Sequence, residues 1–244
     1  MSGHSKWHNI QGKRGKADKA RSGLFTKFAR SITMAASQGG ADPEMNFTLR
    51  LAVEKAKSIN MPKDNIERAI KRGSGELDDG AKLEEVMYEG FGPGGSTFLV
   101  EAVTDNKVRT VSEIKNVFSK NNGTVGGPGS VKWQYKNLGV LRFTISEKNK
   151  LKDKWPEVEL ALIEAGLEDI EESEFGIELF CPVTNFKNMM DTVKAYNIVL
   201  EESGLEWVAK EKVSLSTDES KKAEGLYNAL DEMDDVKAVF SNAD

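Results

Sequence analysis

"GVLRFTISEKNKLKDKWPEVELALIEAGLEDIEE", residues 139–172, changes its hydrophobic period twice. The apolar run at 139–145 predicts a strand, the amphipathic run at 155–166 a helix, and residues 167–172 a second strand. Three further segments are predicted as strand, helix and strand: "FGIELFCPV" (175–183), "NFKNMMDTVKAYN" (185–197) and "SGLEWVAKEKVSL" (203–215). The order strand, helix, strand, strand, helix, strand is that of the split ferredoxin-like unit.

The residues before this stretch also alternate between strand and helix patterns. "LEEVMYEGF" (83–91) and "STFLVEAVTD" (96–105) predict two strands, and "NKVRTVSEIKNVFSKN" (106–121) predicts a helix. "SVKWQYK" (130–136) alternates Val131, Trp133 and Tyr135 with polar residues, so we predict a half-buried strand there.

The C-terminal segment predicts one more helix and one more strand. "STDESKKAEGLYNALDEM" (216–233) begins with Ser216 as the predicted N-cap, and "DVKAVFSN" (235–242) reads as a strand. This last strand has a partner only if it returns to the sheet of residues 80–136. We therefore predict three domains, the third inserted in the second. Their residues are 1–74, 75–136 with 206–244, and 137–205.

Residues 1–74 predict a basic arm followed by a bundle of three helices. The first helix lies within residues 16–40, and it starts either soon after residue 16 or, where the pair Ser22-Gly23 forms a break, only after Ser22. The second helix has Asp42 as its predicted N-cap and Pro43 at its first position, and the third covers about 63–72, ending at Gly73. The predicted buried stripe of the second helix is Met45, Leu49, Ala52 and Ala56. The fold class is thus α/β (α+β): a helical bundle plus two ferredoxin-like α/β units.

Charge is divided unevenly along a chain with a formal net charge of −5. Residues 1–75 hold 15 Lys and Arg residues against 6 Asp and Glu residues, a balance of +9, and the remainder holds 19 against 33, a balance of −14. A basic segment joined to an acidic remainder is typical of a protein that binds a polyanion with one end.

The basic residues at the start of the chain are accompanied by an indole, amides and glycines. We expect residues 1 to about 16 to be mobile when unbound, because they show no apolar period. Lysine and arginine bind phosphate, and tryptophan stacks on an unpaired base. The candidate nucleic-acid-binding residues are Lys6, Trp7, His8, Lys13, Arg14, Lys16, Lys19, Arg21, Lys27 and Arg30.

Several other function classes lack their residues. His4 and His8 are the only histidines and have no carboxylate between them, so we expect no metal and no catalytic triad. Cys181 is the single cysteine and is predicted to be a buried packing residue. No run of about 18 apolar residues is present, so we expect a cytoplasmic protein without membrane contact. Because no catalytic set of residues can be assembled, we also expect a non-enzymatic protein without cofactor or small-molecule substrate.

"GFGPGG" (90–95) has the glycine spacing of a dinucleotide-binding loop, but a strand follows it where that loop needs a helix. Two interpretations remain. Pro93-Gly94 suits a type II hairpin turn, whereas Gly92, Pro93, Gly94 and Gly95 together could form a projecting loop that contacts a partner. "NNGTVGGPGS" (121–130) has the same two interpretations.

Five motifs together resemble the YebC/PmpR family, which includes mitochondrial translational activators: "GHSKWHNI", "KRGKADKARSGLFTKFAR", "NMPKDNIERAIKRG", "YEGFGPGG" and "NNGTVGGPGSVKWQY". The resemblance covers essentially the whole chain. It implies a three-domain α/β protein with an N-terminal helical domain. It also implies a cytoplasmic DNA-binding transcriptional regulator, while members are linked as well to translation, including relief of ribosomes stalled on proline-rich sequences.

Three functions follow from these observations. The first is a regulator of gene expression that binds DNA or structured RNA through the basic arm, with DNA favoured by the resemblance. The second is a ribosome-associated, RNA-dependent translation factor. The third is an adaptor whose acidic units bind a basic protein.

Overall fold

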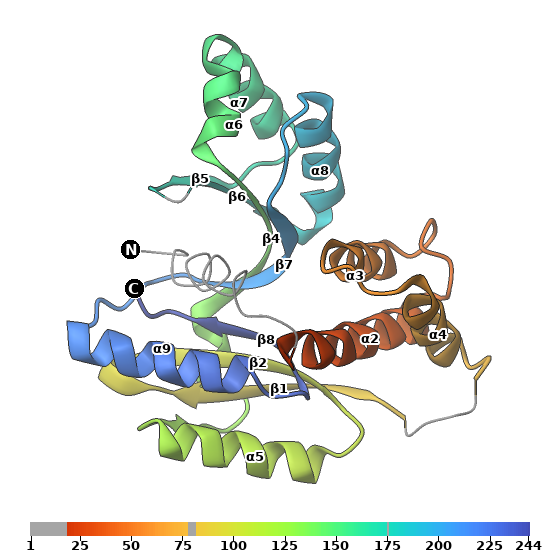
Figure 1. Ribbon diagram of the computed structural model, residues 1–244. Helices are drawn as coiled ribbons and strands as arrows, with labels where there is room; N and C mark the ends of the chain where they lie inside the picture. Colours follow the sequence, from red (N-terminus) through yellow and green to blue (C-terminus); the bar gives the residue numbers. More distant parts are fainter. Residues whose placement is uncertain (1–18, 78–81, 175) are drawn as a thin grey trace. The chain divides into compact units, whose positions relative to one another are not determined.

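A computed structural model describes residues 19–77, 82–174 and 176–244 (Figure 1). The predicted mobile arm of residues 1–16 lies outside them. The described residues form two compact units, one from residues 133–212 and the other from the flanking residues up to 132 together with 213–243. We call the first the inserted unit and the second the outer unit.

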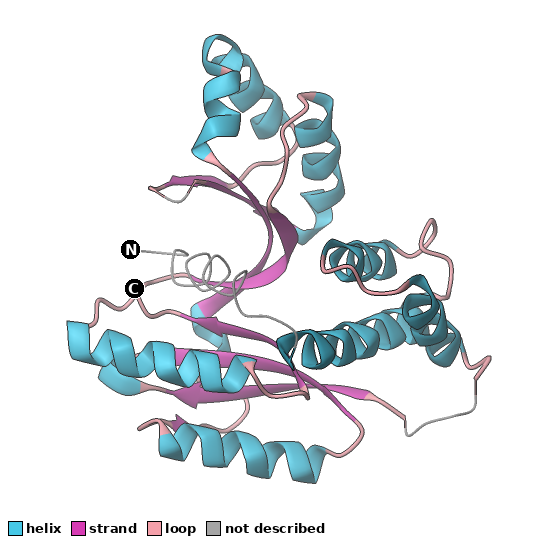
Figure 2. Cartoon of the chain, in the orientation of Figure 1, coloured by secondary structure: helices cyan, strands magenta, loops and turns pink. Residues whose placement is uncertain are grey.

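The inserted unit has the predicted order of elements, with one additional short helix directly after its first strand. These are β4 (Tyr135–Phe143), α6 (Ile145–Lys150), α7 (Trp155–Glu164), β5 (Asp169–Glu172), β6 (Ile177–Pro182), α8 (Phe186–Ala195) and β7 (Glu202–Ala209). The strands lie in the order β5-β6-β4-β7, and each pair is antiparallel. This is the strand order of a ferredoxin-like sheet, and Figure 2 shows the helices of this unit on one side of it.

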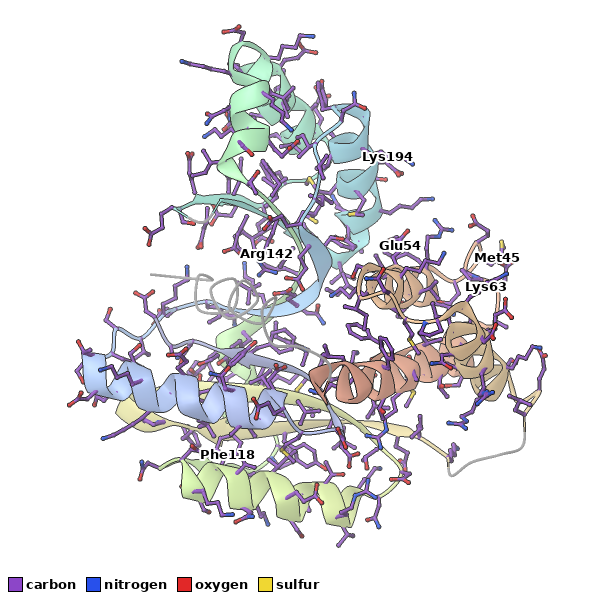
Figure 3. All side chains as sticks on the ribbon, viewed as in Figure 1. Met45, Glu54, Lys63, Phe118, Arg142 and Lys194 are labelled. Atoms are coloured by element: carbon purple, nitrogen blue, oxygen red, sulfur yellow. The ribbon has the colours of Figure 1, made fainter. Side chains whose placement is uncertain are left out.

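Alternation along β4 separates the two faces of this sheet. A Cβ atom on Gly139 would meet the ring of Phe186, and the ring of Phe143 lies 6.3 Å from that of Trp155, so these residues face the helices. The intervening Val140 packs with Leu138 and Phe180 on the other face. Arg142 lies on that same face by register, and it is the buried charged residue labelled in Figure 3.

The outer unit contains the second sheet. Its elements are β1 (Glu84–Phe91), β2 (Thr97–Thr104), α5 (Lys107–Lys120), β3 (Thr124–Val125), α9 (Thr217–Asp231) and β8 (Val236–Ser241). The strand order is β3-β1-β2-β8 with antiparallel pairs, so the C-terminal strand does return to this sheet. Ser216 caps α9 through a reciprocal capping box with Glu219, as its position predicts.

One apolar core joins the two helices α5 and α9 to the same face of this sheet. Phe118 of α5, labelled in Figure 3, contacts Phe98 of β2 edge to face, with ring centroids 6.1 Å apart. Leu226 and Leu230 of α9 belong to the same cluster. The mixed α/β class is confirmed, since each unit combines helices with a four-stranded antiparallel sheet. The outer sheet starts with a hairpin and so has a different element order from the inserted one.

Three helices precede this sheet: α2 (Lys19–Gly39), α3 (Phe47–Ser58) and α4 (Lys63–Ser74). They share a core that includes Ile32, Leu49 and Ile66. Gly73 lies inside α4, at a point where α2 comes so close that only glycine fits: a Cβ atom there would lie 2.3 Å from the carbonyl oxygen of Thr33. The expected end at Gly73 is therefore wrong, and Gly75 is the left-handed C-cap residue.

The structure decides between the two possible starts of the first helix, since α2 continues through Ser22-Gly23 without a break. The predicted cap at Asp42 and the predicted burial of Met45 are wrong. Helix α3 is capped by Asn46, whose side chain accepts a hydrogen bond from the Leu49 amide and donates to the carbonyl of Ala35. Because the chain turns at Asp42-Pro43 before this cap, Met45 is 85% exposed instead of buried (Figure 3).

The predicted strand at 130–136 is also wrong in its first half. Residues Lys132–Gln134 form a 3₁₀ turn, β4 starts at Tyr135, and Trp133 is 67% exposed. The buried carboxylate of Glu89 accepts hydrogen bonds from the amides of Val131 and Lys132, at 2.7 and 2.8 Å. Backbone donors used in this way are not available to an extended ladder. The domain boundaries at 74, 136 and 205 remain a proposal.

Candidate nucleic-acid interface

The predicted nucleic-acid-binding residues fall into three groups. Lys6, Trp7, His8, Lys13, Arg14 and Lys16 lie outside the described residues. Lys19 and Arg21 lie in the first turn of α2, where the arm joins the helical bundle. Lys27 and Arg30, further along α2, have partners within the outer unit.

Lys27 and Arg30 bind the segment that connects α9 to β8. The Lys27 ammonium donates to the carbonyl of Asp231. The Arg30 guanidinium donates to the carbonyl of Asp234, at 2.7 Å, and to the carboxylate of Asp235. These two residues therefore connect α2 to the outer sheet, and phosphate binding by them would compete with these contacts.

Asp235 is the centre of this connection and is 5% exposed. Besides Arg30, its carboxylate accepts hydrogen bonds from Arg109 at 2.8 Å, Thr110 at 2.6 Å and Thr104 at 3.1 Å. Burial acts to raise the pKa of Asp235, but the hydrogen bonds from Arg109 and Thr110 outweigh it and hold the pKa below its ordinary value of 3.8. The ionised carboxylate thus holds one residue of α2, two of α5 and one of β2 beside β8.

The "GFGPGG" loop connects the paired strands β1 and β2, so the hairpin interpretation is confirmed. Its turn is not type II. The amide of Ser96 donates to the carbonyl of Pro93, and Gly94 and Gly95 both have positive φ angles, 65° and 78°, which is the pattern of a type I′ turn. Gly94 and Gly95 are exposed, Gly92 is half-buried and Pro93 is buried. Contact of this loop with a partner stays a prediction.

The second glycine loop, 121–130, is organised by Glu89. Its carboxylate accepts hydrogen bonds from the backbone amides of Gly129, Val131 and Lys132. Burial acts to raise the pKa of Glu89, and these three hydrogen bonds lower it below its ordinary value. The anion that these amides bind is therefore a side chain of the protein itself, which leaves Gly127 and Pro128 as the exposed tip.

A cationic hollow of about 750 Å³ lies within the outer unit and was not predicted from the sequence. Helix α4 lines it with Asn65, Arg68 and Arg72, which are three and four residues apart and so share one face. Helix α2 lines it with one face as well: Thr26, Ala29, Arg30 and Thr33. The remaining lining residues are Phe25, Met61, Ala69, Leu83 and Asp105.

The sequence contained a signal for this site. Asn65, Arg68 and Arg72 lie in "NMPKDNIERAIKRG", on a face of α4 that also includes the buried Ala69. The pattern alone predicts a solvated polar face, and the approach of α2 converts it into the wall of a hollow.

The described residues hold no group of three or more His, Cys, Asp or Glu side chains placed to bind a metal ion. Cys181 is buried, as predicted, and burial raises the pKa of its thiol to about 11. Across residues 19–77, 82–174 and 176–244, no helix has both the length and the apolar composition needed to cross a membrane.

Known proteins resemble the chain along its whole length. A family model described as "TACO1/YebC protein N-terminal domain" matches residues 5–76, and one described as "TACO1/YebC second and third domain" matches residues 83–243. A crystal structure of a conserved hypothetical protein, Aq1575 from Aquifex aeolicus, is similar with a TM-score of 0.82 and 36% identity, covering 94% of this chain and 92% of that one.

Two relatives are named probable transcriptional regulatory proteins. The one from Fusobacterium nucleatum is 45% identical over 100% of this chain and 96% of its own length. The one from Caldanaerobacter subterraneus is 41% identical over 100% of this chain and 98% of its own length. Matched by both family models and by full-length relatives, the chain belongs to the TACO1/YebC family.

Proposed function

We propose that the protein is a cytoplasmic, non-enzymatic regulator of gene expression that binds nucleic acid through the basic arm and the start of α2. The division of charge carries this proposal: residues 1–75 have a balance of +9, whereas the remainder has −14. The acidic remainder repels a polyanion, so contact is directed to the N-terminal end. The names of the relatives support a role in transcription, and we take DNA as the first target to test.

The arm residues Lys6, Trp7, His8, Lys13, Arg14, Lys16, Lys19 and Arg21 form the proposed contact surface. We leave Lys27 and Arg30 out of it, because they bind the segment between α9 and β8. The exposed tip Gly94-Gly95 is the proposed contact with a second partner. We assign the protein no reaction, cofactor or small-molecule substrate.

One observation favours an RNA target acting in translation as the second candidate. Trp7 lies among cations in the arm, and an indole stacks on unpaired bases, which structured RNA offers and a DNA duplex does not. In this alternative the protein binds ribosomes, and activates translation or relieves stalling on proline-rich sequences.

Salt dependence of binding tests the arm. Replacing Lys13, Arg14 and Lys16 with alanine should weaken binding to both DNA and RNA and flatten the slope of log K against log salt by about 2 to 3, since each phosphate contact contributes about 0.7 to 0.9. A matched control replaces three exposed lysines of the inserted unit, Lys152, Lys154 and Lys194, and should leave the slope unchanged. An unchanged slope in the arm variant would remove these residues from the interface.

Sedimentation of cell lysate through a sucrose gradient separates the two candidates. Comigration with ribosomal particles that survives DNase and is lost with RNase would favour the translation factor. Recovery in the light fractions alone, together with binding to duplex DNA, would favour the transcriptional regulator.

A further inference from the structure

We propose that the hollow between α2 and α4 binds one unstacked nucleotide of the nucleic acid that the arm holds. This inference rests on the proposed function and adds a site to it. The site is built from residues of the outer unit and contains none of the arm residues.

Helix α4 supplies the groups that would hold phosphate. Arg68 and Arg72 are one helical turn apart on the lined face, and both are exposed to solvent at the hollow. A guanidinium group binds phosphate through two parallel N–H groups, so two of them suit a phosphodiester. The acidic residues of the same helix do not line the hollow: Glu67 pairs with Lys63, and Asp64 lies in the first turn.

Helix α2 supplies a wall that is fixed in place. Thr33 donates to the carbonyl of Ala69 at 3.0 Å, which ties this wall to α4. Arg30 is held by Asp234 and Asp235, so its side chain keeps one position at the edge of the hollow and forms part of the wall without binding phosphate. A wall that is already ordered reduces the entropy lost when a ligand binds.

The rest of the lining suits a base more than a free inorganic anion. Phe25, Ala29, Met61 and Leu83 are apolar, and an aromatic side chain among them provides a surface for a base. Asn65 offers both an amide donor and a carbonyl acceptor, the pair of groups that recognises a base edge. Asp105 adds an acceptor, with one oxygen already bound to Arg109 at 2.8 Å.

The size of the hollow restricts the ligand that it can hold. A hollow of about 750 Å³ falls in the range of sites for small organic ligands, about 300 to 1,000 Å³. Stacked bases inside a duplex cannot enter such a site, whereas an unpaired nucleotide can. The hollow therefore favours a single strand, a loop or a bulge over a continuous duplex.

The test compares two pairs of cations on the same helix. R68Q/R72Q removes two charges that line the hollow, and K63Q/K71Q removes two exposed charges of α4 that do not. Both variants change exposed residues, and circular dichroism checks that each retains the helical content of the unsubstituted protein. The probes are fluorescein-labelled single strands of about 12 nucleotides, as RNA and as DNA, and the duplex of the same DNA sequence, read by fluorescence anisotropy.

We expect R68Q/R72Q to lose roughly tenfold to hundredfold in affinity for a single strand and less than about threefold for the duplex. K63Q/K71Q should lose less than about threefold for both. Equal losses by the two variants, or equal losses on single strand and duplex, would overturn the inference while leaving the proposed function intact. Absence of binding by the unsubstituted protein to every probe would overturn the proposed function itself.

Discussion

The two units of this protein each bury a cluster of charged side chains, and the clusters have opposite compositions. In the outer unit one carboxylate, Asp235, is surrounded by two guanidinium groups and two hydroxyls. In the inserted unit one guanidinium, Arg142, is surrounded by three carboxylates. The minority charge is the buried centre in both cases, with Asp235 5% and Arg142 3% exposed.

The Arg142 cluster connects three neighbouring strands on one face of their sheet. Its Nε atom donates to Glu178 of β6 at 2.9 Å, and its two terminal nitrogens donate to Glu206 of β7 at 2.8 and 3.0 Å. Glu202 of β7 lies 3.5 Å away and is partly exposed. Arg142 therefore binds both carboxylate oxygens of Glu206 and one oxygen each of Glu178 and Glu202. The bidentate contact with Glu206 is the strongest geometry for such a pair.

The difference in composition reverses the effect on the carboxylates. The hydrogen bonds to Asp235 overcome burial and lower its pKa, whereas burial, helped by the nearby charge of Glu206, raises the pKa of Glu178 despite its bond to Arg142. A close ion pair therefore does not by itself determine how a carboxylate titrates, because for Glu178 burial and the charge of Glu206 together outweigh the contact with Arg142. This contrast predicts different responses to substitution and to pH.

Removal of the centre of the inserted cluster should have the largest effect. R142M leaves Glu178 and Glu206 buried without a counter-charge, and such losses cost about 3–5 kcal/mol of unfolding free energy. Urea unfolding followed by tryptophan fluorescence reports on this unit, because Trp133, Trp155 and Trp207 all lie in it. The triple variant R142M/E178Q/E206Q is the control and should recover most of the loss. A cost below about 1 kcal/mol for R142M would contradict this account.

Removal of the centre of the outer cluster should cost less, because its two arginine partners are partly exposed to solvent, whereas the partners of Arg142 include two buried carboxylates. D235N keeps the shape of the side chain but removes the charge that binds Arg30 and Arg109, and we expect a loss of about 2–3 kcal/mol. Urea unfolding followed by circular dichroism measures the loss, and hydrogen exchange should show weaker protection of the amides in α2 and β8.

The neighbouring Asp234 provides the matched control. Arg30 contacts its carbonyl and not its side chain, so D234N should change stability by less than about 0.5 kcal/mol. The pH dependence gives a second check. Because folding lowers the pKa of Asp235, its stabilising effect is present above the ordinary value of 3.8 and is lost as the pH falls below it. D235N should therefore lose less stability than the unsubstituted protein on acidification, and equal losses would contradict the role of this carboxylate.

Neither cluster could be predicted from the sequence, although the sheets that hold them could. The alternation in "GVLRFTI" is enough to predict a strand, but the partners of Arg142 lie 36 and 64 residues away, and only the register of β6 and β7 brings them together. Asp235 similarly depends on Arg30, 205 residues earlier. Periodicity encodes which face a residue takes, and it carries no information about which distant charge shares that face.

The same limit explains the hollow and the local errors. Nothing in the pattern of α4 shows that α2 comes close to Arg68 and Arg72, so the hollow cannot be predicted from that pattern. Asp42-Pro43 is a strong helix start in isolation, but Asn46 also reaches the carbonyl of Ala35 in the preceding helix and so fixes the start four residues later. Local signals compete, and the tertiary contact decides between them.

The smallest effect should come from E178Q, and its sign tests the comparison most directly. Folding raises the pKa of Glu178 above its ordinary value of 4.5, so loss of its proton opposes folding, and the unsubstituted protein loses stability as the pH rises through the folded pKa. Glutamine cannot lose that proton. E178Q should therefore change the unfolding free energy by less than about 1 kcal/mol at pH 7. Its unfolding free energy should rise relative to that of the unsubstituted protein as the pH increases from about 4 to about 8.

Unfolding free energies measured by urea across this pH range, with the exposed E211Q as the control of equal charge, give the result. E211Q should show no such trend. If the unfolding free energy of E178Q instead rises relative to the unsubstituted protein as the pH falls, folding lowers the pKa of Glu178. The contact with Arg142 would then outweigh burial, as the contact with Arg109 helps to do for Asp235. The two clusters would then differ in composition alone and not in how their carboxylates titrate.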